Sequence, residues 1–280
     1  MRDDTIAKGG RNFYVVPNWL GHIRRRGLLG DPRSPLAPGT VCISDLSFRY
    51  SQRVPAVFAN LNLKLCAGEM VCFVGPRGSG KSTLMQLIQG LNQPTRGVIV
   101  ACGRKDLRGR LQEARVAVVS REPMLFGGSV VGNLMMADPM ADFNRIMRAC
   151  QRAGVHDLVM SLPAAYDTDI GERGKALSPG QRQCISLARA LLRDPDILVL
   201  DEAFSECCQE WSQRLVNALN GLKGQLTILL ASRRVQPGLA LDVVYRMGRP
   251  TPMKLAVMDG GGDAVEEAPG VTRLRGARGI

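Results

Sequence analysis

A glycine-rich loop at residues 75–83 has the residue types that bind a triphosphate. It fits the phosphate-binding pattern G-x-x-x-x-G-K-[ST], and it reads Gly75-Pro76-Arg77-Gly78-Ser79-Gly80-Lys81-Ser82-Thr83. Backbone N–H groups of such a P-loop converge on an anion, and the following helix adds a partial positive charge. We expect all nine residues to contact nucleotide. Lys81 is also a candidate catalytic residue at the β- and γ-phosphates, and Ser82 a Mg²⁺ ligand.

The segments on either side of the loop must hold it in place. Residues 69–74 are a short apolar run of buried-strand character, and residues 84–89 are good helix formers. Strand, glycine turn and helix together aim backbone N–H groups at a phosphate. The alternative, a chance glycine-rich turn with a surface lysine, does not account for this context.

Two adjacent carboxylates follow a second buried strand. Residues 197–200 are all apolar and lead into Asp201 and Glu202. In a parallel sheet this carboxyl end lies beside the P-loop. Asp201 is therefore expected to hold Mg²⁺, directly or through water, and Glu202 to polarise the attacking water as a catalytic carboxylate. The alternative is a helix N-cap followed by a surface glutamate.

The alternation of strands and helices predicts an α/β fold with a largely parallel sheet. Further strands are predicted at residues 41–50, 57–65, 98–101, 116–119, 226–231 and 243–245. Helices are predicted at residues 142–160, with a break near Gly154, and at residues 179–192 and 211–222. Prolines and glycines indicate an irregular arm or linker at residues 1–40, and residues 259–280 are predicted to be a disordered tail.

Composition sets a few limits. The net charge of +12 is spread thinly, and its densest run, Arg24-Arg25-Arg26, is interpreted as a solvated linker, with contact to lipid headgroups as the alternative. No stretch reaches the roughly 18 apolar residues of a membrane span. Met1-Arg2-Asp3-Asp4 is not followed by the apolar region of a signal peptide. The eight cysteines form no C-x-x-C pair, and with only two histidines this argues against a zinc site.

A third motif gives the chain a family resemblance. Leu177-Ser178-Pro179-Gly180-Gln181 stands shortly before the strand that ends in Asp201 and Glu202. It resembles the ABC signature motif, normally L-S-G-G-Q, and residues 41–258 resemble an ATP-binding cassette (ABC) domain. The resemblance implies a P-loop NTPase core with a mostly parallel sheet, an antiparallel β subdomain, and a helical signature subdomain at about residues 120–190.

Two loops resemble those of ABC exporters in particular. Thr168–Gly174 resembles the T-E-V-G-E-R-G loop that touches the membrane domain in that family, and Glu122–Val130 resembles the stretch after its Q-loop. Tyr50 stands where such cassettes stack an aromatic ring on adenine. The resemblance implies an ATP-binding subunit that uses Mg-ATP to drive transport, located peripherally at the cytoplasmic face of a membrane beside a transmembrane domain.

The signature residues are implied to act on a partner's nucleotide. Cassettes of this family pair head to tail, so that each ATP lies between one P-loop and the other subunit's signature motif. By that resemblance Ser178, Gly180 and Gln181 would bind the γ-phosphate of an ATP that the partner holds. The positive end of the helix that begins there points at the same anion.

Four positions depart from the family pattern, and they cluster around catalysis. Arg121 replaces the Q-loop glutamine, Ser232 replaces the switch histidine, and Pro179 replaces a signature glycine. The D-loop, Ser205-Glu206-Cys207-Cys208, lacks its usual aspartate. A guanidinium cannot ligate a cation, and serine cannot carry positive charge to a γ-phosphate. We expect a cassette that binds Mg-ATP, hydrolyses it slowly, and pairs with a different, more complete cassette.

Two other interpretations stay open. One is a catalytically degenerate regulatory cassette whose bound ATP holds a dimer closed; Arg121 and Ser232 favour it, whereas Glu202 favours the ATPase. The other is a soluble ABC protein acting on nucleic acid, which would suit the positive charge. The exporter-type loop at Thr168–Gly174 and the single cassette argue against a nucleic-acid partner.

Overall fold

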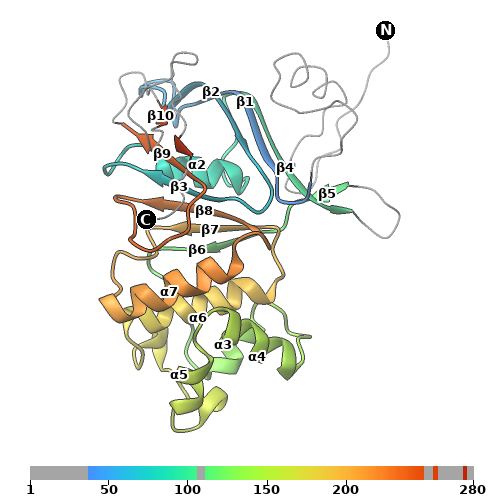
Figure 1. Cartoon of the computed structure of the whole chain (residues 1–280), viewed down its shortest axis with the longest axis vertical. Coiled ribbons are helices and arrows are strands. Elements are labelled where there is room, and N and C mark those ends of the chain that lie inside the picture. Colours follow the sequence, from blue (N-terminus) through green and yellow to red (C-terminus); the bar gives the residue numbers. More distant parts are fainter. Residues whose placement is uncertain (1–36, 106–110, 249–254, 258–273, 276–280) are drawn as a thin grey trace.

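The chain folds into stacked layers of strands and helices (Figure 1). The structure is a computed structural model that describes residues 37–105, 111–248, 255–257 and 274–275. An antiparallel sheet lies at one end, a mainly parallel sheet in the middle, and a group of helices at the other end. The predicted α/β fold with an antiparallel β part and a helical part is confirmed. Almost all of the predicted arm, up to residue 36, lies outside the described residues.

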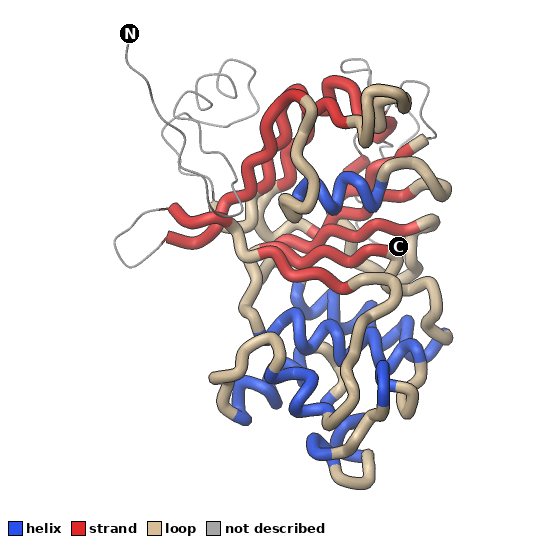
Figure 2. The backbone as a smooth tube through the Cα atoms, turned by 180° about the vertical axis from the view of Figure 1, so that it is seen from behind, coloured by secondary structure: helices blue, strands red, loops and turns tan. Residues whose placement is uncertain are grey.

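The antiparallel sheet has the strand order β2-β1-β4-β5. Its strands are β1 (Val41–Phe48), β2 (Phe58–Leu65), β4 (Arg96–Lys105) and β5 (Leu111–Glu113). Buried side chains such as Ile43 and Leu63 face the body of the molecule. The sheet therefore covers the P-loop helix, α2 (Lys81–Ile88), as Figure 2 shows from behind.

The central sheet has the order β10-β9-β3-β8-β7-β6, and β11 also pairs with β9. Its strands are β3 (Met70–Val74), β6 (Val116–Val119), β7 (Ile197–Asp201), β8 (Thr227–Ser232), β9 (Val243–Met247), β10 (Leu255–Val257) and β11 (Leu274–Arg275). The pairs between β9, β3, β8, β7 and β6 are parallel, whereas β10 and β11 run antiparallel to β9. Because parallel strands end at one edge, the segments after β3, β6, β7 and β8 meet there.

Alternate residues of the central strands belong to two separate cores. Cys72 and Leu200 pack with the helices on one face, whereas Phe73 and Val199 pack with α2 and the antiparallel sheet on the other. A sheet that is buried on both faces needs apolar residues at every position. This explains why the strand sequences show uninterrupted apolar runs and no alternation.

The remaining helices lie together on the far face of the sheet (Figure 1). They are α3 (Val130–Met135), α4 (Phe143–Arg152), α5 (His156–Ser161), α6 (Pro179–Leu192), α7 (Gln209–Leu222) and the short 3₁₀ turns η1 (Ala165–Asp167) and η2 (Glu172–Gly174). The break predicted near Gly154 separates α4 from α5. The backbone of Gly154 has a φ of +67°, a conformation that suits glycine. None of the helices in the described part of the chain is long and apolar enough to cross a membrane.

Several short elements of the fold were not predicted. The sequence analysis missed the six-residue helix α3, the three-residue strands β5 and β10, and the 3₁₀ turns η1 and η2. Within the segment expected to be a disordered tail, residues 274 and 275 pair with β9 as β11, so that expectation does not hold for them. The rest of residues 258–280 lies outside the described residues.

A buried threonine joins the two sheets. The Thr227 hydroxyl donates to the carbonyl of Gly39 at 2.8 Å and accepts from the N–H of Gly68 at 3.1 Å, and the side chain is fully buried. Gly39 leads into β1 and Gly68 lies in the turn before β3. One hydroxyl therefore ties the start of the antiparallel sheet and the turn before the P-loop strand to β8.

We predict that Thr227→Val lowers the free energy of unfolding by about 1–3 kcal/mol, because it leaves a buried donor and a buried acceptor unpaired. Thr227→Ser keeps the hydroxyl and should lose less. Urea unfolding of both variants measures the difference. A Thr227→Val protein as stable as the wild type would show that this hydroxyl contributes nothing to the junction.

Candidate nucleotide-binding site

The P-loop lies at the carboxyl edge of the sheet, between β3 and α2. The Gly75 N–H donates to the carbonyl of Ser232 at 3.2 Å, which joins the loop to the end of β8. A Cβ at Gly75 would lie 2.2 Å from the carbonyl oxygen of Met247, so no larger residue fits. Gly80 caps α2 in the left-handed region, at φ +87°. These contacts aim the first N–H groups of α2 at the concave face of the loop.

The Lys81 side chain is folded back onto its own loop. Its ammonium donates to the carbonyls of Gly75 at 2.7 Å and Pro76 at 2.9 Å, and to the Ser79 hydroxyl at 3.3 Å. Burial lowers the pKa of Lys81, while Glu202 and Asp201 act in the opposite direction. The cation is therefore held inside the loop by neutral oxygens, ready to turn toward an anion.

Ser82 and Asp201 meet across the site, as the sequence predicted. The Ser82 hydroxyl donates to Asp201 Oδ1 at 3.1 Å. Burial raises the pKa of Asp201, and the hydrogen bond from Ser82 opposes that shift. A hydroxyl beside a carboxylate supplies the hard oxygen ligands that Mg²⁺ prefers. The donor set thus fits the predicted metal.

Glu202 projects from the turn after β7 and not from a helix. Its φ of +50° is uncommon for a glutamate, and its N–H donates to the carbonyl of Ala231 at 2.8 Å. The next helix, α7, begins only at Gln209 and has Cys208 at its N-cap. The alternative of a helix N-cap at Asp201 and Glu202 is therefore wrong.

Two guanidinium groups flank the Glu202 carboxylate. Arg233 Nη2 lies 3.3 Å and Arg121 Nη1 3.9 Å from Glu202 Oε2, and the Glu202 side chain is only 15% exposed. Arg121 stands at the end of β6, in the place of the expected glutamine. The candidate catalytic carboxylate is thus paired with cations in the structure.

Tyr50 stands at the P-loop helix and is 60% exposed. Its hydroxyl lies 2.8 Å from the Thr83 Oγ1, and its ring packs edge-to-face on Phe48 with the centroids 5.0 Å apart. With this exposure the ring is not packed into the core. An open π-face beside the loop is what adenine stacking requires.

The signature residues begin α6. Ser178 and Gln181 form a capping box, in which the Ser178 N–H donates to Gln181 Oε1 at 2.7 Å. Pro179 occupies the first helical position, where its missing N–H has no helical partner to lose. A Cβ at Gly180 would lie 2.3 Å from the Cβ of Trp211 on α7, so only glycine fits.

The signature residues do not join the P-loop within one chain. Among the described residues, no hydrogen bond or ion pair connects Ser178, Gly180 or Gln181 with residues 75–83. This agrees with a role toward a second molecule, which stays a prediction.

The two exporter-like stretches lie against each other. Val130 donates its N–H to the carbonyl of Thr168 at 3.1 Å, and Ile170 donates to Gly128 at 3.0 Å. Ser129 and Asp169 form an antiparallel bridge between the two segments. The structure thus joins Glu122–Val130 and Thr168–Gly174 into one surface of the helical subdomain.

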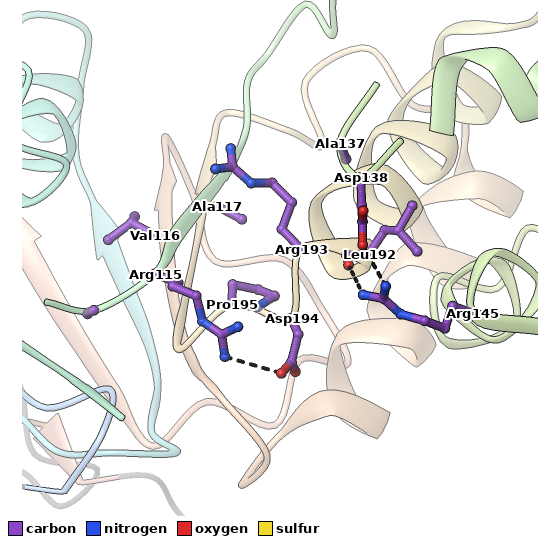
Figure 3. A pocket seen from close by; sticks show the side chains of 11 residues that line it. Arg115, Val116, Ala117, Ala137, Asp138, Arg145, Leu192, Arg193, Asp194 and Pro195 are labelled. Carbon is purple, nitrogen blue, oxygen red and sulfur yellow. Dashed lines mark hydrogen bonds and ion pairs between the residues drawn. The ribbon is translucent and has the colours of Figure 1, made fainter. Parts of the chain in front are cut away.

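A cavity of about 500 Å³ lies away from this site. Figure 3 shows Arg115 pointing to Asp194 and Arg145 to Asp138, with the paired atoms 3.2 Å and 2.6 Å apart. Arg115 precedes the first residue of β6, whereas Asp201 ends the parallel strand β7. The cavity is therefore at the opposite edge of the sheet from the P-loop, and the two ion pairs involve every charged lining residue except Arg193.

Comparison with known proteins decides the family. The ABC transporter family profile matches residues 58–205, just over half of the 280 residues. The chain belongs to the ABC transporter family. The matched region includes the P-loop and the signature motif, and it ends after Asp201 and Glu202. These motifs belong to the ATP-binding domain of the family.

The chain is similar to several ABC transporters. It is 35% identical over 231 residues to ABC transporter B family member 13 of Arabidopsis thaliana, covering 80% of this chain and 19% of that protein. It is 34% identical over 220 residues to ABC multidrug transporter E of Aspergillus fumigatus, covering 76% of this chain and 17% of that protein. The chain thus spans under a fifth of these two relatives.

A solved structure supports the exporter type. The structure of a bacterial Atm1-family ABC exporter with ATP bound aligns with a TM-score of 0.66 at 25% sequence identity. The alignment covers 78% of this chain and 39% of that one. The predicted resemblance to an exporter-type ABC cassette is therefore confirmed.

Three contacts around the candidate site were missed by the sequence analysis. Arg233 pairs with Glu202, Glu206 binds Arg121 at 3.1 Å, and Gln183 Nε2 donates to the carbonyl of Arg121 at 2.6 Å. These partners lie 31, 85 and 62 residues apart in sequence. The only available signal was the position of Arg233 directly after the switch position, Ser232.

We predict that ATP affinity falls at alkaline pH, and does so at a lower pH than an ordinary lysine would allow. Burial lowers the pKa of Lys81 in the structure, whereas a bound triphosphate favours the charged form. Above this lowered pKa, ATP binding takes up a proton, so ATP affinity decreases as the pH rises through it. Titration with ATP from pH 7.5 to 10.5 measures this.

Lys81→Arg is the control, since a guanidinium keeps its charge over that range. It should bind more weakly but with little pH dependence. A wild-type affinity that stays constant to the alkaline limit would contradict a depressed Lys81 pKa.

Proposed function

We propose that this chain is the ATP-binding part of an ABC exporter that holds Mg-ATP firmly and hydrolyses it slowly at its own P-loop. The observation that carries the proposal is the contrast within one site. The P-loop, Ser82 and Asp201 have the arrangement for binding, whereas Glu202 is paired with Arg233 and with Arg121, which stands in place of the Q-loop glutamine. The residues expected to bind Mg-ATP therefore match the family pattern, whereas the surroundings of the candidate catalytic carboxylate do not.

The residues divide the reaction between them. Loop N–H groups and Lys81 bind the β- and γ-phosphates, and Ser82 and Asp201 would hold Mg²⁺, which neutralises phosphate charge when bound. Glu202 accepts a proton from water while the oxygen of that water bonds to the γ-phosphorus. The bond from that phosphorus to the β-bridging oxygen breaks, and ADP leaves with the electron pair. Removing one preorganised group from such a site costs about 10²–10³ in rate, and Arg121 and Ser232 mark two replacements.

The helical subdomain supports docking to a transmembrane domain. Several large apolar side chains there stand in solvent, and they include Met124 (69% exposed), Phe126 (43%), Met136 (54%), Met140 (89%), Phe143 (54%) and Met160 (54%). Met124 and Phe126 belong to the exporter-like stretch that packs on Thr168–Gly174. Exposed apolar side chains beside these loops favour a partner surface. We propose that the partner is a transmembrane domain and that the chain lies at the cytoplasmic face of its membrane.

A second cassette completes the proposed motor. Ser178, Gly180 and Gln181 begin α6, and the positive end of this helix suits a γ-phosphate held by another subunit. A homodimer would repeat Arg121 and Ser232 in both sites. We therefore favour a heterodimer in which the partner cassette carries the faster site.

The alternative is a regulatory cassette that binds ATP without hydrolysing it. The ion pairs of Glu202 with two arginines favour it, since they occupy the carboxylate that would serve as the base. The two functions differ in whether Glu202 matters for turnover.

We predict that Glu202→Gln slows single-turnover release of γ-phosphate roughly 10²-fold and leaves ATP affinity unchanged, because a general base contributes about 10²–10⁴. Labelled ATP and Mg²⁺ with the full chain measure both quantities. Glu210→Gln is the matched control, since the Glu210 side chain is 66% exposed and, within the described residues, its ion pair is with the neighbouring Arg214. Equal rates for wild type and Glu202→Gln would favour the regulatory cassette.

We also predict that the chain occurs with a second, different cassette. Isolation of the intact complex from its native membrane, followed by peptide sequencing, should recover a cassette with glutamine and histidine at the positions that align with Arg121 and Ser232. Recovery of this chain as the sole cassette would contradict the heterodimer.

A further inference from the structure

Charges alternate along four side chains at the carboxyl edge of the central sheet. Glu206 Oε1 accepts from Arg121 Nη2 at 3.1 Å and from its Nε at 3.3 Å. Arg121 Nη1 also lies 3.9 Å from Glu202 Oε2, which Arg233 Nη2 approaches to 3.3 Å. The four residues follow β6, β7 and β8, so the network joins the ends of three adjacent strands.

The backbone of Arg121 is fixed to the signature helix. Gln183 lies on α6, is only 1% exposed, and donates from Nε2 to the carbonyls of Arg121 at 2.6 Å and Ser120 at 3.1 Å. Among the described residues its Oε1 has no hydrogen-bond partner, so the amide is held through its donor side. The place of the Arg121 guanidinium beside Glu202 therefore depends on α6.

We infer that Arg121 is a positioning residue that restrains Glu202, and that Glu206 limits this restraint by binding the same guanidinium. The inference rests on the proposed function, since it concerns the hydrolysis rate at the same site. Arg121 and Arg233 both face Oε2 of Glu202. An ion pair that stabilises the resting carboxylate more than the transition state raises the barrier. Hydrolysis thus requires that Arg121 move away from Glu202.

The distances give the direction of the competition. Arg121 is nearer to Glu206 than to Glu202, with two nitrogens within 3.3 Å of one oxygen. Loss of the Glu206 charge therefore releases the guanidinium toward Glu202. If the Arg121 charge is lost instead, Arg233 is the one cation of this four-residue network that still pairs with Glu202.

The test is the rate of single-turnover γ-phosphate release by the full chain with labelled ATP and Mg²⁺. Arg121→Met keeps the side-chain length and removes charge and donors. We expect it to raise the rate about fivefold, the upper end for a partly exposed ion pair, with ATP affinity within a factor of about two of wild type. Arg121→Lys keeps the charge and should remain as slow as the wild type.

Arg115→Met is the matched control. Arg115 precedes the same strand, β6, at its other end, and its side chain is 49% exposed in an ion pair with Asp194. The same exchange there should leave the rate unchanged. A rise in this control as well would overturn the inference, because loss of any surface charge would then suffice.

Glu206→Gln tests the competition. It should lower the rate two- to threefold, about the value of a surface ion pair, and should have no effect once Arg121 is methionine, because Glu206 acts through Arg121. A role of Glu206 in stability alone would produce the same change in both backgrounds.

The outcomes separate this inference from the proposed function. If ATP binds but the Arg121→Met rate equals or falls below the wild-type rate, or stays undetectable, the restraint is wrong and the proposed ATP binding stands. If the wild-type chain does not bind Mg-ATP, both are wrong.

Discussion

The parallel pairing of β3, β8, β7 and β6 is the constraint on which the site depends. Parallel strands end at one edge, so the P-loop after β3, Asp201 and Glu202 after β7, and Ser232 after β8 are neighbours although they lie far apart in sequence. The pairing is possible because both faces of the strands are buried, one against α2 and the other against the helices. The two cores thus fix the distances within the site.

The predictable part of the fold was encoded locally. The bounds of α6 and β6 follow directly from a proline at a helix start and from an apolar run of strand length, and both match the structure. The short helix α3 has too few turns to show a helical period, and β5 too few residues to show an alternation. Their existence depends on neighbours that the local sequence does not reveal.

The candidate site shows the same division. Lys81, Ser82 and Asp201 were predicted because a motif fixes their spacing or the end of a strand fixes their place. The pairing of Glu202 with Arg233 depends instead on the register of β7 against β8, in which Asp201 faces Ala231. A shift by one residue would point the Arg233 side chain elsewhere. Such contacts are a property of the sheet, and single-sequence patterns do not specify them.

The Lys81 ammonium is bound by oxygens of its own loop. The ammonium already satisfies the carbonyls of Gly75 and Pro76, so an arriving triphosphate must displace those hydrogen bonds before it gains the lysine. Nucleotide binding is then an exchange of partners, and the affinity reports a difference between two sets of contacts. The same hydrogen bonds surround a buried cation with protein oxygens, which offsets the cost of removing it from water. The loop can therefore remain folded between one nucleotide and the next.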